Sequence, residues 1–443
     1  MPDPASRLEE IRFGYGPRAG QALASGGLDP DRVMAQLTAR DKPAEAWTGP
    51  TLADRFVLID DQVARRRAKL PPLTDPTYNL NTIRARDALA FIARPTAASC
   101  GFVERLVNLW SNRLTVASSP GVAILIPPLR DEAVRPHITG RFPDMLRAVL
   151  WQPAMLAYLN QNVSSGPNSS YGLRKGRGLN ENLARELLEL HSMGTGFTQA
   201  DVTELARLLA GMQAAGNGPE LDERRVEPGE KTILGDTYTT GIPEIDRLAE
   251  TIAMRPETAH SVARMLARHF IADEPPADLV ETLAQTYLQS GGHLPPMYRA
   301  LLTHPAAHDQ TLHKLRSPQD FMAASLRATG LSGDEEETPA FRKKGMRLGE
   351  VMARMGQPVF AARRPDGWPE TAPGFLTPPM VAARLEWATD LARLTGERAD
   401  PVAQAQHLLG DLGTPLLFGA VAGAEQRWEG LAVLLGSPDF MRR

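Results

Sequence analysis

The sequence has one cysteine and no long hydrophobic run, and each scarcity excludes a class of protein. Cys100 is the only cysteine among 443 residues, so a disulfide within the chain and a multi-cysteine metal site are excluded. Its apolar neighbours favour a small buried side chain over a reactive thiol. The longest apolar runs, such as Val122–Pro127, are far shorter than the ~20 residues that span a bilayer. We therefore expect no transmembrane segment.

The sequence also lacks an excess of charge of one sign. Its formal net charge is −3, and no basic stripe with interleaved aromatic residues is present, so we expect no nucleic-acid partner. A Walker A motif and a Gly-x-Ser-x-Gly elbow are also absent. Residues 1–20 contain acidic side chains and no apolar core of a signal peptide. The sequence as written predicts a cytoplasmic protein, with a periplasmic location as the alternative.

Helical periodicity dominates what is present. It predicts an all-α fold, a single helical domain over residues 1–443 with about fifteen helices. A run of β-branched residues punctuated by Gly235 and Gly241 predicts one small β-hairpin near residues 226–240. The sequence also predicts three long loops, which cover residues 161–178, 214–235 and 358–379. Loops of this length within a compact domain are usually functional or mobile.

The densest polar cluster lies in residues 180–211, NENLARELLELHSMGTGFTQADVTELARLLAG. The pattern predicts a helical hairpin, with helices at Glu181–Met193 and Gln199–Met212 joined by a glycine-containing loop. On the first helix His191 falls in the middle of the apolar face, which is more typical of a core histidine than of a ligand. On the second, Thr198 and Asp201 have the spacing of a capping box.

The other face of the first helix is polar and supports two interpretations. Glu181, Arg185 and Glu189 recur every four residues, as in exposed ion pairs worth only ~0.3–0.5 kcal/mol each. Alternatively, the flanking loops cover this face, and partial burial shifts the pKa values of its carboxylates toward acid–base work or ligand binding. The sequence leaves both interpretations open.

These patterns give two groups of candidate site residues. The candidate catalytic residues are Glu186, Glu189, Arg185 and Arg207. The candidate binding residues are Asn180, Glu181, Asn182, Asp201, Glu204, His137, Arg135, Arg174 and Trp368. Arg174 belongs to a basic stretch just before a helix N-terminus, where an anion is favoured. Trp368 is an aromatic residue in a proline-rich loop and needs a hydrophobic partner, as at a pocket wall.

Metal-ligand patterns are weak. Glu257 and His260 form a single Glu-x-x-His pair, and His304 and His308 straddle a proline just past a helix end. Both sets are more typical of surface or capping residues than of a metal site. We therefore predict no metal and no cofactor.

The 180–211 segment resembles the signature of a bacterial family called domain of unknown function 1800. The family pattern runs Asn-Glu-Asn-Tyr-Ala-Arg-Glu-Leu-Leu-Glu-Leu-His-Thr-Leu-Gly, followed by Tyr-Thr-Gln-x-Asp-Val-x-Glu-x-Ala-Arg-x-Leu-Thr-Gly. The matching positions are Asn180, Glu181, Asn182, Ala184, Arg185, Glu186, Glu189, His191, Gly194, Thr198, Asp201, Glu204, Ala206, Arg207 and Gly211. Weaker likenesses cover most of the chain, among them RFGYGP at 12–17, RSPQDF at 316–321 and the closing SPDFMRR.

The resemblance implies no defined reaction. It implies a possible partner, an exported phosphatase-like protein of unknown function encoded nearby. Ser111 and Arg113 stand where relatives often carry histidines, and Val226 occupies another such position. This chain therefore lacks the histidines that a relative could use for a metal.

Together these observations predict a ligand- or partner-binding accessory protein with a polar cleft around the 180–211 hairpin. One alternative is a hydrolase in which a glutamate of the signature helix is the acid or base and an arginine holds an anionic group. Another is a buried ion-pair network with a purely structural role. Whether the protein is an enzyme stays open at this point.

Overall fold

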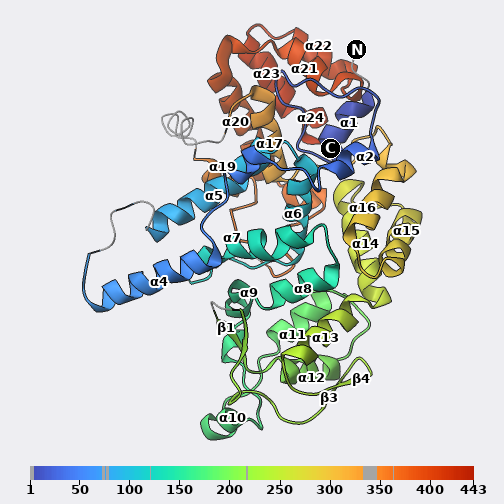
Figure 1. Cartoon of the computed structure of the whole chain (residues 1–443). Helices are drawn as coiled ribbons and strands as arrows, with labels where there is room; N and C mark the ends of the chain where they lie inside the picture. The colour runs from blue at the N-terminus through green and yellow to red at the C-terminus, as the bar shows by residue number, and fades with distance from the viewer. Residues whose placement is uncertain are drawn as a thin grey trace.

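The computed structural model describes residues 4–71, 75, 79–119, 121–215, 218–332, 347–362 and 364–443. It is 61% helical, which confirms the predicted all-α class. Among the described residues, fifteen α-helices have eight or more residues, as expected from the sequence; they are α1, α4, α5, α6, α8, α12–α17 and α20–α23. Shorter helical turns connect them (Figure 1).

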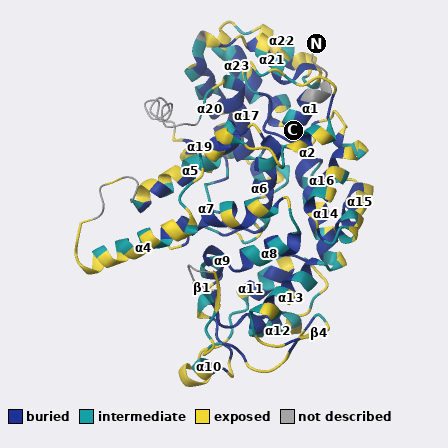
Figure 2. Cartoon of the chain, viewed as in Figure 1, coloured by how far each residue is buried: buried dark blue, intermediate teal, exposed yellow. Residues whose placement is uncertain are grey.

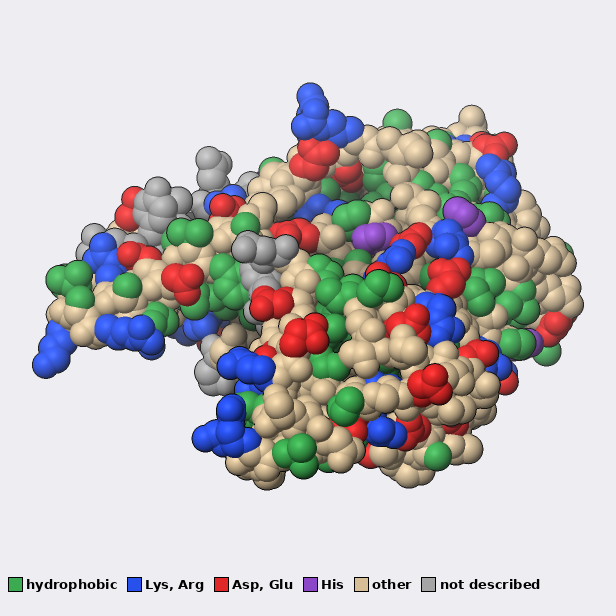
Figure 3. All heavy atoms as spheres, turned by 60° about the horizontal axis from the view of Figure 1, so that its bottom comes forward, with side chains coloured by type: hydrophobic (Ala, Val, Ile, Leu, Met, Phe, Trp, Pro, Cys, Tyr) green, Lys and Arg blue, Asp and Glu red, His purple; other side chains and the backbone are tan. Residues whose placement is uncertain are grey.

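The N-terminal part of the chain contributes α1 (Pro4–Arg12), α2 (Pro30–Ala35), α3 (Lys42–Glu45), α4 (Leu52–Arg67), α5 (Leu80–Ala97) and α6 (Gly101–Arg113). Thr51 begins α4 with a capping box to Asp54, and the Asn79 side chain caps α5. Helices α4 and α5 project from the body, and the far end of α4 is basic (Figures 1 and 3).

The middle of the chain forms the lower part of Figure 1. Its helical elements are η2 (Ala123–Leu125), α7 (Ile126–Pro128), η3 (Leu129–Val134), η4 (Arg135–His137), α8 (Phe142–Leu150), α9 (Pro153–Tyr158), η5 (Gln161–Val163), α10 (Ser170–Lys175), α11 (Asn182–Glu186), η6 (Leu187–His191) and α12 (Gln199–Leu209). The strands that follow are β1 (Met212–Ala215), β2 (Gly218–Leu221), β3 (Lys231–Ile233) and β4 (Asp236–Tyr238).

In the C-terminal half, the regular elements among the described residues are all helices, joined by irregular segments such as 308–317 and 356–362. Its first elements are α13 (Ile242–Ala253), α14 (Pro256–Phe270), α15 (Ala277–Gln289), α16 (Leu294–Thr303), η7 (Pro305–Ala307), α17 (Pro318–Thr329) and α19 (Leu348–Arg354). The remainder are η8 (Ala372–Phe375), α20 (Pro378–Thr395), η9 (Gly396–Arg398), α21 (Pro401–Leu408), η10 (Gly410–Leu412), α22 (Pro415–Ala422), α23 (Arg427–Gly436) and α24 (Pro438–Met441).

Buried apolar side chains form two clusters, and Figure 2 marks the buried stretches of each element. The first core contains residues between Phe13 and Ala307. The second combines Leu8, Ile11 and Ile92 with residues of the C-terminal helices. Helix α17 packs against both α5 and α20, so the second core is built from the two ends of the chain. The single-domain organisation stays a prediction, and the boundary between the two cores is where the candidate site lies.

The β-structure partly corrects the sequence reading. Strands β3 and β4 form the expected antiparallel hairpin, with Thr232 opposite Thr237. A second antiparallel hairpin, β1–β2, lies where the sequence predicted the end of a helix and the loop 214–235. The predicted helix Gln199–Met212 ends earlier because Ala210 is extended and Gly211 has φ +91°, a conformation that terminates a helix.

Candidate functional site: an arginine-lined cleft and an inner cavity

A cleft of about 950 Å³ lies between elements of the two cores. One wall comes from α6, α14 and the end of η6, and the other comes from α19, the 356–380 segment and the start of α20. Five arginines and three carboxylates line it. The arginines are Arg113, Arg264, Arg268, Arg354 and Arg364, and the carboxylates are Glu189, Asp366 and Glu370. The cleft therefore carries an excess of positive charge.

The arginines of the cleft differ in how far they are neutralised. Arg354 pairs with Glu386 at 2.6 Å and Arg268 with Glu274 at 3.6 Å, and Arg268 also donates to the Asp273 carbonyl at 2.9 Å. The side chains of Arg264 and Arg364 are exposed and have no hydrogen-bond or ion-pair partner within the described residues. These two side chains are available to an incoming anion.

Arg113 joins the signature hairpin to the cleft. From the end of α6 its guanidinium donates to the His191 carbonyl at 3.2 Å, to the Ser192 carbonyl at 2.7 Å and to the Ser261 hydroxyl at 2.8 Å. Burial lowers the pKa of Arg113 to about 10, so the side chain is still charged at neutral pH. His191 is buried, and that burial, with Arg113 nearby, lowers the pKa of its imidazole to about 3. His191 is thus a neutral core residue.

The signature helix changes its winding halfway along. Residues 182–186 are α-helical, whereas Leu187–His191 form a π-helix. A π-turn contains an extra residue, so side chains after it point in a different direction from those before it. Glu181 and Arg185 form the expected pair at 3.4 Å, but Glu189 leaves their line and reaches the wall of the cleft. Of the signature carboxylates, it is the one among the cleft's lining residues.

Glu186 is half-buried beside other carboxylates. Burial is the main cause that raises the pKa of Glu186, and repulsion from Glu189 and Asp366 adds to it, while Arg185 opposes it. Burial raises the pKa of the nearby Tyr158, and the negative charges of Glu186 and Asp366 add to this effect. Residue Asp366 comes from the 358–379 segment, so that segment, rather than the 161–178 loop, brings charge to the hairpin.

Several predicted binding residues hold the hairpin's own backbone. Asp201 completes the capping box, accepting from the Thr198 N–H at 2.8 Å, and also accepts from the Leu234 N–H at 2.7 Å. Asn180 donates to the Leu159 carbonyl at 2.8 Å and accepts from the exposed Asn182 at 2.9 Å. These bonds fix local structure and do not converge on a cavity.

The pair of Arg207 and Glu204 on the hairpin is connected to the loops that flank it. Arg207 binds Glu204 at 2.7 Å and the fully buried Glu227 at 3.4 Å. Glu227 also accepts from the Asn168 backbone at 3.0 Å and from its side chain at 2.7 Å. Within this part of the chain, the 161–178 and 214–235 segments bond to each other, as between the Gly166 N–H and the Arg225 carbonyl at 2.8 Å. They brace the hairpin's base.

Arg135, His137 and Arg174 lie apart from the cleft lining. Arg135 binds the buried Glu104 at 2.7 Å. His137 lines a different cavity of about 450 Å³. Arg174 is exposed on α10 and stacks over Tyr171, at the lower end of the molecule in Figure 1. The structure therefore separates these three predicted residues from Glu189.

An inner cavity of about 100 Å³ adjoins the cleft. The walls that it shares with the cleft include Asn112, Trp368 and Glu370. The Asn112 side chain holds the Trp368 backbone through two hydrogen bonds, from the Trp368 N–H at 2.7 Å and to its carbonyl at 3.0 Å. Trp368 is thus the one predicted site residue that borders both spaces.

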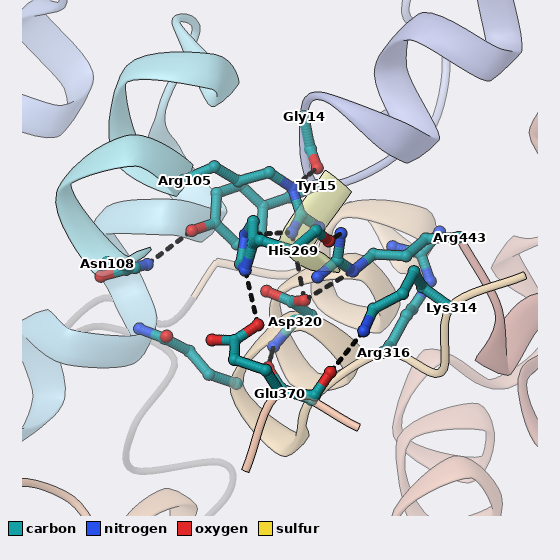
Figure 4. Close-up of polar contacts among 12 residues, drawn as sticks. Gly14, Tyr15, Arg105, Asn108, His269, Lys314, Arg316, Asp320, Glu370 and Arg443 are labelled. Atoms are coloured by element: carbon teal, nitrogen blue, oxygen red, sulfur yellow. Dashed lines mark hydrogen bonds and ion pairs between the residues drawn. The ribbon is translucent and has the colours of Figure 1, made fainter. Parts of the chain in front are cut away.

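A buried charge cluster forms one wall of the inner cavity (Figure 4). Asp320, in the first turn of α17, lies 3.2 Å from Arg105 and 3.1 Å from Arg443. Burial opposes ionisation of Asp320, but these arginines outweigh it and hold its pKa well below the usual range. Arg316 lies nearby, and burial lowers its pKa to about 9. The cluster joins three segments that are distant in sequence: α6, the 316–320 segment and the end of the chain.

His269 and Glu370 form a second polar pair in the same wall. The His269 Nδ1 lies 2.8 Å from a Glu370 oxygen, and its Nε2 lies 3.5 Å from Arg105. Because a guanidinium only donates, Nε2 is the acceptor and Nδ1–H donates to Glu370. Burial lowers the pKa of His269 to about 4, with Glu370 opposing and Arg443 adding to the effect. The imidazole is therefore neutral, and its orientation is fixed on both sides.

Comparison with known proteins gives one match. A family model described as "Protein of unknown function (DUF1800)" matches residues 10–442. The chain belongs to this family. No curated protein and no solved structure matches it. Membership in DUF1800 confirms the resemblance drawn from the 180–211 signature, and it assigns no reaction.

Two further searches of this DUF1800 chain concern the described residues alone. No helix there is long and apolar enough to cross a bilayer. No group of three or more histidine, cysteine, aspartate or glutamate side chains there is arranged to hold a metal ion.

Sequence reasoning missed the buried charges around Glu104 and Asp320. The available signal was the RSPQDF segment, in which Ser317 caps α17 and Asp320 follows three residues later. That spacing is also what an ordinary helix start requires. Only the fold shows that Asp320 faces arginines from α6 and from the end of the chain.

Proposed function

We propose that the protein binds an anionic ligand, bearing phosphate or carboxylate groups, in the arginine-lined cleft. The observation that carries this proposal is the set of five arginines facing three carboxylates, with Arg264 and Arg364 free of partners among the described residues. Arginine forms bidentate, charge-assisted bonds with such groups. The first turn of α20, at Thr377, also faces the cleft, and its helix dipole adds positive potential.

Removing the two free arginines should weaken anion binding. We expect the Arg264→Ala/Arg364→Ala variant to bind a panel of citrate, inorganic phosphate and a tri-aspartate peptide at least about ten-fold more weakly, because each lost charge-assisted bond contributes on the order of 1.5 kcal/mol. Isothermal titration at low and high salt measures this effect. High salt should reduce the affinity of the unsubstituted protein more than that of the variant.

The matched control is Arg66→Ala/Arg67→Ala, which removes two exposed arginines from α4, away from the cleft. It should leave affinity unchanged. Equal loss in both double variants would mean that the anions bind by overall charge, and the cleft proposal would fail.

A second candidate function is acid–base hydrolysis with Glu186, favoured by the raised pKa that burial, Glu189 and Asp366 give it. If this is correct, Glu186→Gln should reduce turnover of p-nitrophenyl esters and phosphates by ~100-fold or more. The Glu186→Gln variant should bind anions with the affinity of the unsubstituted protein and keep the same melting temperature. The control is Glu181→Gln, which changes a partly exposed carboxylate at the start of the same helix, paired with Arg185. Turnover that survives Glu186→Gln, or a variant that only unfolds earlier, contradicts the hydrolase.

The exported phosphatase-like partner and the cytoplasmic location stay predictions from the sequence. An accessory role would be consistent with a cleft that binds an acidic segment of a partner as well as a small anion.

A further inference from the structure

We propose that the inner cavity is a separate ligand site that takes a small molecule with an apolar body and a carboxylate head. This site is distinct from the anion-binding cleft, and its existence does not depend on the cleft's proposed role. Three observations carry it: the apolar part of its lining, the unpartnered polar atoms on its walls, and its connection to the cleft.

Part of the cavity wall is hydrophobic. Phe91, Val116, Leu129, Phe360 and Phe375 line it. Val116, Leu129 and Phe360 belong to the first core or its margin and Phe91 to the margin of the second, so the cavity lies where the two cores meet. Protein interiors contain few voids larger than a water molecule, and an apolar void of roughly 150 Å³ can bind benzene. The cavity of about 100 Å³ is smaller than that void but opens into the cleft at Asn112, Trp368 and Glu370, so it suits a short branched chain, or a single ring that extends into the opening.

The polar atoms left over on the cavity wall are mainly donors. Among the described residues, Arg105 Nη2, Arg130 Nε and Ser111 Oγ are buried without a hydrogen-bond partner. The Asn108 Oδ1 is the one acceptor of this group among the lining residues. Buried donors are almost always satisfied by protein, water or ligand. A ligand head that supplies acceptors meets the requirement of this wall.

The charged groups of the lining are largely paired. Four cationic side chains, Arg105, Arg130, Lys314 and Arg443, line the cavity with two carboxylates, Asp320 and Glu370. Arg130 and Lys314 also pair with Glu104 and Asp273, which lie outside the lining. His269 is held neutral between Arg105 and Glu370. The unpartnered donor atoms, rather than net charge, therefore favour a head that accepts hydrogen bonds, such as a carboxylate, over a cation or an amine.

The cavity is reached from the cleft. Leu109, Asn112, Trp368, Pro369 and Glu370 border both spaces. The Trp368 backbone is held by two hydrogen bonds with the Asn112 side chain. A ligand that enters the cleft therefore passes this segment to reach the cavity.

Benzoate is the probe that tests the proposal, used with the full chain. Saturation-transfer NMR and isothermal titration should show one saturable benzoate site, with weaker binding of toluene, which lacks the head. Ala362→Leu fills the cavity and should reduce benzoate affinity by at least about ten-fold. Ala361→Leu changes the neighbouring residue, which is not among the lining residues, and should stay within about two-fold.

A second variant keeps the proposal testable if Ala362→Leu does not fold. Ser111→Ala removes one unpartnered donor without adding volume, and should reduce benzoate affinity by about three- to ten-fold at unchanged melting temperature. The Arg264→Ala/Arg364→Ala variant should bind benzoate like the unsubstituted protein, which separates this site from the cleft.

Three results would overturn the proposal. The absence of saturable benzoate binding would leave a cavity filled by water only. Toluene that binds as tightly as benzoate would make the carboxylate head irrelevant. Benzoate binding that is lost in the arginine double variant but kept in Ala362→Leu and Ser111→Ala would place the benzoate site in the cleft. Failure of the citrate and phosphate titrations would affect the cleft alone.

Discussion

Replacing Glu104 by Gln is expected to lower the free energy of unfolding by about 3–5 kcal/mol. Glu104 is 1% exposed and binds Arg135 at 2.7 Å, Arg94 at 3.2 Å and Arg130 at 3.3 Å. A neutral amide would leave these three buried or half-buried guanidinium groups with Asp131 as their remaining carboxylate, which binds Arg94 at 3.1 Å and Arg135 at 3.3 Å but not Arg130. Urea denaturation followed by circular dichroism measures the loss.

The control for Glu104 is Glu250→Gln, which breaks the exposed pair with Arg141. An exposed pair of this kind contributes ~0–1 kcal/mol. If the two variants lose similar stability, the Glu104 cluster is no more than a set of surface-like pairs, and its structural role is refuted.

Glu104 also gives stability a dependence on acid. Burial alone would raise its pKa, but the attraction of Arg135, Arg94 and Arg130 outweighs burial and lowers the pKa to about 2. A carboxyl with a depressed pKa in the folded state binds its proton more readily when unfolded. Its contribution is therefore complete above the ordinary pKa of a glutamate and is lost as the pH falls toward 2. The Glu104→Gln variant should lose less stability over that range.

Asp320→Asn is expected to cost a similar amount, about 3–5 kcal/mol, because it leaves Arg105 and Arg443 buried without their shared carboxylate. The surface control is Asp61→Asn, whose partner is Arg65 at 2.9 Å. Differential scanning fluorimetry ranks the variants, and urea denaturation gives the free energies.

A double variant sharpens the Asp320 test. Adding Arg443→Met to Asp320→Asn removes one of the stranded charges, so it should recover part of the lost stability. Simple addition of the two single losses would show that the residues are uncoupled, contrary to their 3.1 Å separation.

These clusters bear on the structural interpretation of the signature hairpin. Buried ion-pair networks do exist in this protein, but they are centred on Glu104 and Asp320 rather than on the Glu181–Arg185 face. The hairpin pair is partly exposed, with 34% and 42% of the two side chains accessible. Its contribution to stability is therefore small, about 0.3–0.5 kcal/mol.

Local sequence patterns predicted the local structure well. The apolar face that buries Leu183 and Leu187 follows from helical periodicity, and the Thr198–Asp201 capping box follows from residue type and spacing. The helical class follows from the same periodicity repeated along the chain. Each of these features depends on residues within a few positions of one another.

The site could not be predicted in the same way, since it depends on contacts over long separations. Asp320 meets Arg105 across 215 positions, and Asn112 meets Trp368 across 256. The β1–β2 hairpin was missed for a different reason: Met212–Ala215 has no β-branched residue, so its composition gave no strand signal. Trp368 was found because an aromatic residue in a loop needs a partner.

The π-turn at Leu187–His191 determines the direction in which the side chains of this part of the signature helix point. Residues before the turn contact α12, for example through the hydrogen bond from the Thr203 hydroxyl to the Glu181 carboxylate. Residues within the turn contact α6 and the cleft, through the bond of Arg113 to the His191 carbonyl and through Glu189. A chain shortened by one residue within this turn would keep the Glu181–Arg185 pair and rotate Glu189 away. The length of the turn, more than its composition, therefore couples the family's signature to the cleft.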